Sequence, residues 1–160
     1  MKTAVLYYSY DGNSVLVAEA LKGPLGADVF RIETQDEKRR GGLAKYIWGG
    51  RQVLSRAKPG IKPLALKPEN YDLIVIGGPV WAGSPAPALV SWIEAAKPRG
   101  KKIALFVCHR GGKGRAVEKL RALLEGNTIT GEIDFINPGK LAENGELGLR
   151  IGDWVRTLKV

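Results

Sequence analysis

The stretch SYDGNS, residues 9–14, contains residue types that could bind an anion. If a helix begins at Ser14, its first backbone N–H groups lie together with the hydroxyls of Ser9 and Ser14. Phosphate binds at such helix ends because the N–H groups are unpaired and the helix dipole is positive there. Gly12 would let the backbone approach a ligand closely. An ordinary capped helix start has a similar composition, so the stretch by itself leaves both interpretations open.

A β-hairpin is a third interpretation, since Asp11-Gly12 between two apolar runs is typical of a hairpin turn. The residues that follow favour a helix instead. Ser14, Val17, Ala18 and Leu21 fall on one helical face, with Glu19 and Lys22 off it. Gly23-Pro24 is typical of a helix end. Either Asp11 or Asn13 could cap the helix start. We therefore predict a strand over 3–8, a loop over 9–13 and a helix over about 14–22.

Two later stretches also contain residues suited to a binding site. PVWAGSPAP, which begins at Pro79, places Trp81 among glycine and proline, where an indole is a good stacking surface. Packing between this loop and the sheet is the alternative. CHRGGKG, which begins at Cys108, supplies flexible backbone and cations, but it lacks the Ser or Thr that follows lysine in a Walker A loop. The whole chain has one His and one Cys, which argues against a metal site, and we expect Cys108 to be a core residue.

The rest of the chain supplies the elements that must position these loops. YDLIVIGG (71–78) and KKIALFVCH (101–109) are continuous apolar runs, as expected of strands buried on both faces. Further strands are predicted at 27–33 and 129–136, and helices at about 42–56, 86–96, 115–124 and 146–158. Because strands alternate with helices, the predicted fold is an α/β doubly wound five-stranded parallel sheet of order 2-1-3-4-5 in a three-layer α/β/α sandwich. The loops that meet at its carboxyl edge are 9–14, 79–83 and 108–114.

Length and composition are those of a single domain over residues 1–160. Apolar residues make up 44% of the chain and charged residues 26%, which is ordinary for a globular protein. No apolar run approaches the roughly 20 residues needed to cross a membrane, and the N-terminus lacks the pattern of a signal peptide. The single cysteine cannot form an intramolecular disulfide. These features predict a cytoplasmic protein.

The net charge of +9 comes from one segment, residues 38–67. The other 16 basic residues balance the 16 acidic ones. The segment could be a solvated helix face, a docking surface for an acidic protein, or a surface that binds polyanions. No nucleic-acid-binding motif accompanies it. It contains nine basic residues and no acidic one, namely Lys38, Arg39, Arg40, Lys45, Arg51, Arg56, Lys58, Lys62 and Lys67.

SYDGNS, IGGPVWAGSPAP and FVCHRGG, at this spacing on a βα pattern, resemble the flavodoxin family in its short-chain form. The resemblance covers almost the full length, and it implies a flavodoxin-like fold, non-covalent FMN and transfer of one or two electrons. It implies that the FMN phosphate binds Ser9, Tyr10, Asp11, Gly12, Asn13 and Ser14. It implies that the flavin ring lies against Pro79, Val80, Trp81, Ala82 and Gly83, with Trp81 stacking, and against Cys108, His109, Arg110, Gly111 and Gly112.

Two features depart from the family pattern. The common pattern has threonine where this chain has Asp11, and a carboxylate beside a phosphate is unfavourable. It is tolerated if Asp11 turns away to cap the helix, or if Arg110 or Lys113 compensates. The flavodoxin-like protoporphyrinogen oxidases also carry Asp-Gly in this loop. Flavodoxins are also usually acidic, whereas this chain is basic.

The resemblance implies an electron carrier without a catalytic acid or base, because the flavin supplies the chemistry. The alternative is an FMN-dependent oxidoreductase of the NAD(P)H:quinone or protoporphyrinogen type, although no second nucleotide fingerprint is present. A polyanion-binding module that uses residues 38–67 is an alternative of another class. As a carrier, the protein would be a monomer or homodimer whose partner is an acidic redox protein such as a ferredoxin, or a reductase. The expected docking residues are Arg39, Arg40, Lys45, Arg51 and Arg56.

Overall fold

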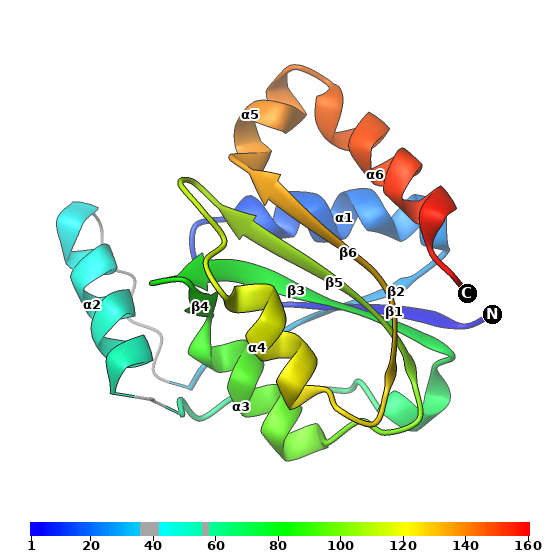
Figure 1. The fold of residues 1–160 in the computed structure, drawn as a ribbon, viewed down its shortest axis with the longest axis horizontal. Helices are drawn as coiled ribbons and strands as arrows, with labels where there is room; N and C mark the ends of the chain where they lie inside the picture. The colour runs from blue at the N-terminus through cyan, green and yellow to red at the C-terminus, as the bar shows by residue number, and fades with distance from the viewer. Residues whose placement is uncertain (36–41, 56–57) are drawn as a thin grey trace.

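Five parallel strands form the central sheet of the computed structural model, which describes residues 1–35, 42–55 and 58–160 (Figure 1). The sheet order is β2-β1-β3-β5-β6, which is the predicted 2-1-3-4-5 order once the short β4 is set aside. β4 pairs antiparallel with the end of β3. The strands are β1 (Thr3–Tyr7), β2 (Asp28–Arg31), β3 (Leu73–Trp81), β4 (Ser84–Pro85), β5 (Lys102–His109) and β6 (Thr128–Ile136).

Helices cover both faces of this sheet, and α2 stands beside its carboxyl edge, near the end of β3 (Figure 1). Among the helices of the described residues, none has the length and apolar character needed to span a bilayer. A 3-10 turn at Pro68–Asn70 precedes β3. One face carries α1 (Asn13–Leu25), α5 (Pro138–Glu143) and α6 (Glu146–Thr157), the other carries α3 (Pro87–Ala96) and α4 (Ala116–Leu123), and α2 spans Gly42–Leu54.

The buried strands separate two apolar cores. Leu73 and Ile74, neighbours on β3, point to opposite faces of the sheet and belong to different cores. β3 continues through Gly77, where the Phe106 ring occupies the space that a side chain would need. A Cβ built on Gly77 would lie 2.3 Å from Phe106 Cδ1. The glycines after the apolar run therefore extend the strand.

The first helix is longer than predicted. Gly23-Pro24 was expected to end it, but α1 runs through both residues to Leu25. Pro24 lies in the last turn, where its missing N–H removes only the single bond to the Ala20 carbonyl before the helix ends. Gly26 ends the helix in the left-handed conformation, with its N–H donating to the Gly23 carbonyl at 3.1 Å.

The stretch from Pro79 to Pro85 was predicted as a loop, and this prediction is partly wrong. β3 continues to Trp81, which pairs with Ser84, while Val80 pairs with Pro85. The chain reverses at Ala82-Gly83, whose φ angles are 46° and 69°. Two consecutive positive φ angles suit a tight hairpin between twisted strands. The sequence patterns also did not predict helix α5, which follows β6 directly.

Candidate functional site

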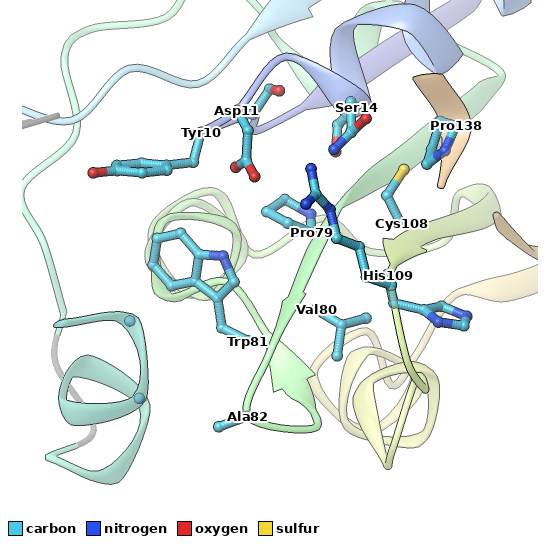
Figure 2. A pocket seen from close by; sticks show the side chains of 15 residues that line it. Tyr10, Asp11, Ser14, Pro79, Val80, Trp81, Ala82, Cys108, His109 and Pro138 are labelled. Atoms are coloured by element: carbon cyan, nitrogen blue, oxygen red, sulfur yellow. The ribbon is translucent and has the colours of Figure 1, made fainter. Parts of the chain in front are cut away.

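A cavity of about 320 Å³ lies at the carboxyl edge of the sheet, where β1, β3 and β5 end (Figure 2). Doubly wound sheets bind ligands at this edge, where the strand order reverses. The volume falls within the roughly 300–1,000 Å³ of small-molecule sites. The lining residues are Ser9, Tyr10, Asp11, Asn13, Ser14, Gly49, Gly50, Pro79, Val80, Trp81, Ala82, Cys108, His109, Arg110 and Pro138.

The structure brings the three predicted loops together around this cavity. Figure 2 shows Tyr10 and Trp81 at one side and Ser14 and Cys108 at the other. The predicted residues that do not line the cavity are Gly12, Gly83, Gly111 and Gly112, and the lining residues that were not predicted are Gly49, Gly50 and Pro138.

The N-terminus of α1 has no side-chain cap. The N-cap residue is Gly12, with φ of 91°, and among the described residues no side chain caps the helix start. The prediction that Asn13 or Asp11 caps the helix is therefore wrong. The Gly12 N–H donates to Ser9 Oγ at 3.1 Å, which holds the loop in its turn. The first N–H groups of α1 are left for a ligand, and this is the arrangement that binds phosphate.

Ser14 supplies a hydroxyl on the first turn of this helix. Its side chain is 1% exposed, and its Oγ has no nitrogen or oxygen partner among the described residues. Its polar neighbour is the thiol of Cys108. Burial raises the pKa of Cys108 to about 12, although the Ser14 hydroxyl lowers it slightly. Cys108 is thus a neutral core thiol, as predicted, that also lines the cavity.

Two cationic side chains, Arg31 and Arg110, lie where they could attract an anion bound at this loop. Arg31, at the end of β2, donates from Nη2 to the Ser9 carbonyl at 3.2 Å. Arg110 lines the cavity. Lys113 was expected as a possible counter-charge to Asp11, but its Nζ lies 2.8 Å from Asp134 Oδ1. Arg31 was not predicted as a site residue, because it lies 22 residues after Ser9 and no local sequence pattern indicates the contact.

An aromatic cluster forms the other side of the cavity. The Trp81 ring lies 5.8 Å from the Tyr8 ring, 5.8 Å from the Tyr10 ring and 5.5 Å from the Trp48 ring, measured between centroids. The interplanar angles are 82°, 84° and 65°, so the rings meet edge to face. Trp81 therefore belongs to a packed aromatic wall and is not an isolated loop side chain.

α2 completes this wall, which the sequence did not indicate. A Cβ built on Gly49 would lie 3.4 Å from the Trp81 ring, so the helix backbone packs closely against the indole. Gly50 lines the cavity beside it. Two glycines inside a helix weaken it, and their presence is the sequence signal that could have revealed a close approach to another group.

Asp134 on β6 anchors the third loop. Its Oδ2 lies 3.0 Å from His109 Nε2, and its Oδ1 accepts the bond from Lys113. The hydrogen bond from Lys113 is the main reason that the pKa of Asp134 is lowered, and His109 adds to it against the opposing effect of burial. The His109 ring points away from Trp81 (Figure 2). His109 therefore fixes the loop through Asp134, and its ring is not directed at the aromatic wall.

The second and third loops also contact each other through backbone. The Arg115 N–H donates to the Gly83 carbonyl at 2.9 Å. A Cβ built on Gly114 would lie 2.5 Å from Gly83 Cα, so only glycine fits there. In residues 1–35, 42–55 and 58–160, no cluster of three or more His, Cys, Asp or Glu side chains could hold a metal ion. The site therefore offers amides, hydroxyls and aromatic rings to an organic ligand.

Comparisons with known proteins agree with this architecture. A family model described as Flavodoxin matches residues 2–158. A flavoprotein from Lactobacillus acidophilus NCFM, solved in complex with FMN, has a TM-score of 0.73 and 22% identity, over 89% of this chain and 97% of that chain. A protein from Bacteroides eggerthii DSM 20697 has a TM-score of 0.80 and 19% identity, over 99% and 98%.

A Fusobacterium nucleatum flavodoxin bound to flavin mononucleotide has a TM-score of 0.56 and 14% identity, over 98% of this chain and 96% of that chain. The search of curated proteins found no match. At these identities the solved structures show a shared fold. The family match extends over nearly all of the 160 residues, and the chain therefore belongs to the flavodoxin family.

Proposed function

We propose that this protein binds FMN non-covalently in the cavity and carries electrons between redox partners. One observation carries the proposal: the uncapped start of α1 and an aromatic wall face the same cavity. The first suits a phosphate and the second suits a planar ring system. Family membership and the FMN-bound state of two structural neighbours support the choice of cofactor.

The phosphate end is the loop from Ser9 to Ser14. The N–H groups at the start of α1 would hold the phosphate, and so would the buried Ser14 hydroxyl, which has no nitrogen or oxygen partner among the described residues. Arg31 holds the Ser9 carbonyl and places a positive charge behind the loop. This charge favours a phosphate in the loop, where the exposed Asp11 carboxylate adds negative charge.

The ring end is the aromatic wall. FMN supplies one- or two-electron transfer when it is bound. Trp81 orients the ring by stacking, and Tyr10 and Trp48 hold the Trp81 indole in place. The close approach of Gly49 to Trp81 joins α2 to the wall. Asp134 keeps the third loop in position through His109 and Lys113. No residue is required as an acid or base.

An oxidoreductase that takes hydride from NAD(P)H and reduces a quinone-type acceptor is the alternative activity of the same site. The two functions differ in a steady-state assay. A carrier loaded with FMN oxidises NAD(P)H only when a reductase is added, whereas the oxidoreductase does so alone.

Titration of the apoprotein with FMN tests the cofactor. We expect saturable quenching of flavin fluorescence at one FMN per chain, with riboflavin binding more weakly because it lacks the phosphate. Apoprotein that leaves flavin fluorescence unchanged and releases no heat in a calorimeter would refute the proposal. Equal affinity for FMN and riboflavin would refute the assignment of the phosphate to the start of α1.

A further inference from the structure

We propose that an acidic electron-transfer protein docks on the outer face of α2, formed by Ile47, Arg51 and Leu54. This inference rests on the proposed function, because docking beside the cavity matters only if the cavity holds a redox cofactor. The predicted docking residues Arg39, Arg40 and Arg56 lie outside the described residues, and the side chain of Lys45 is likewise not described. The structural argument uses the described side chains.

The two sides of α2 differ in what they contact. Trp48, Gly49 and Gln52 face the protein: the first two contact Trp81, and Gln52 lines a smaller cavity beside Trp48. Ile47, Arg51 and Leu54 are spaced by four and three residues, so they share the opposite side of the helix. Figure 1 shows α2 projecting from the carboxyl edge of the sheet.

The outer face exposes apolar side chains beside a cation. Ile47 is 56% exposed and Leu54 is 83% exposed, which is unusual for large aliphatic side chains on one helix face. Arg51 is exposed between them, and within the described part of the chain no carboxylate pairs with it. Apolar residues around an arginine are typical of the centre of a protein interface.

The charge of the segment identifies the partner. Nine basic residues and no acidic residue lie between Lys38 and Pro68, while the rest of the chain is neutral. Among the described members of the segment, Lys58 pairs with Glu94 and Lys62 with Glu33, whereas Arg51 pairs with no described carboxylate. A segment with this excess of positive charge speeds encounter with a negatively charged protein and repels a positive one. The partner is therefore an acidic redox protein. A carrier that is itself acidic would instead suit a basic partner.

The position of the face also suits electron transfer. Gly49 and Gly50 line the cavity, so a partner on the outer side of α2 would be separated from it by about one helix diameter, about 10 Å. Trp48 lies on α2 with its ring 5.5 Å from Trp81, so an aromatic path crosses the wall between partner and cavity. The exposed cation Arg51, the exposed apolar side chains and the proximity to the cavity thus coincide on one helix.

Binding and electron transfer with two acidic probes, a [2Fe–2S] ferredoxin and a rubredoxin, test the proposal. The variants are Arg51→Glu and the pair Ile47→Gln with Leu54→Gln, which keep good helix formers on exposed positions. The matched control is Lys159→Glu, which makes the same charge change at the exposed C-terminus, far from α2 in Figure 1. FMN affinity is measured for every variant, so that a failure of cofactor binding is recognised separately.

At 20 mM salt we expect Arg51→Glu to weaken binding of at least one probe and to slow electron transfer about tenfold. The difference should disappear at 0.5 M salt, where exposed charges are screened over a few ångströms. The Gln pair should weaken binding at both salt concentrations, and Lys159→Glu should behave as wild type.

Three results would overturn the proposal. They are failure of wild-type protein to bind either probe at low salt, an equal loss in Lys159→Glu, and unchanged binding in both α2 variants. A fourth arm measures co-sedimentation with vesicles that contain 30% phosphatidylglycerol. If those vesicles are bound through Ile47 and Leu54 while the acidic proteins are not, the face is a membrane-binding surface and the proposal is wrong.

Discussion

Replacing Trp81 with alanine tests whether the aromatic wall holds the flavin ring. Trp81 contacts three aromatic rings and the backbone of α2, so it is the residue that connects the wall to the cavity. Because its contact is with the ring and not the phosphate, we predict that Trp81→Ala weakens FMN and riboflavin by the same factor. The structure also predicts a less stable fold, since the buried Tyr8 and the partly buried Tyr10 and Trp48 lose their central partner.

The size of the effect follows from the contacts. Stacking of a planar base on an aromatic side chain is worth about 1–3 kcal/mol. At about 1.4 kcal/mol per tenfold, the dissociation constant should rise about 5- to 150-fold. The free energy of unfolding should fall as well, because each aromatic pair contributes about 0.5–1.5 kcal/mol beyond its burial. Trp81→Phe keeps a planar face and should lose less of both quantities.

The assay is a titration of apoprotein into flavin, followed by fluorescence quenching, with urea unfolding of each variant in parallel. Trp154→Phe is the matched control for Trp81→Phe, because Trp154 is a buried tryptophan on α6 outside the cavity lining. The reasoning is refuted if folded Trp81→Ala binds both flavins within twofold of wild type. It is also refuted if FMN alone is weakened, because Trp81 would then act on the phosphate end.

Three further predictions concern the loops. Ser14→Ala should weaken FMN about tenfold or more and leave riboflavin unchanged, because hydrogen bonds to charged groups contribute about 1.5–3 kcal/mol; parallel titrations measure this. Cys108 should resist iodoacetamide at pH 8 in the folded protein and react after unfolding in urea, since burial raises its pKa to about 12. Asp134 has a lowered pKa in the fold, caused first by Lys113, so its contribution to stability is present above the unfolded pKa of about 3.9 and is lost as pH falls through the folded pKa. Asp134→Asn should therefore reduce stability at pH 7 by up to about 1 kcal/mol and flatten its decline below about pH 4, measured by urea unfolding across pH.

Local patterns predicted the sheet and the positions of the loops. The apolar runs 71–78 and 101–109 are typical of strands with helices on both sides, and the parallel order then places the three loops at one edge. Ser14 illustrates the success, because its predicted place on the buried face of the first helix is confirmed. The helix cap illustrates a failure. Asp11 and Asn13 have suitable side chains, but Gly12 takes the capping position in a left-handed conformation that favours glycine.

The contribution of α2 could not be predicted because it depends on tertiary contact. Helix propensity treats Gly49-Gly50 as a defect in a helix interior. In the structure, Gly49 lets the helix backbone approach the Trp81 ring, and Gly50 borders the cavity. The same limit applies to Arg31 at the end of β2, whose side chain contacts the carbonyl of Ser9, 22 residues earlier in the sequence. In both cases the functional role appears only when distant segments are placed side by side.

The cations beside the cavity and the cation on the outer face of α2 lie in different parts of the fold, and they have different roles. Lys113 pairs with Asp134, and Arg31 donates to the Ser9 carbonyl, so both cations act locally. Arg51 lies on the far side of α2, about one helix diameter from the cavity. At physiological salt the screening length is about 8 Å, so its field on a bound ring is weak. A diffusing partner meets the outer face directly. The excess positive charge therefore influences association more than the electronic properties of the cofactor, and salt should change the rate of encounter with an acidic partner much more than the affinity for riboflavin.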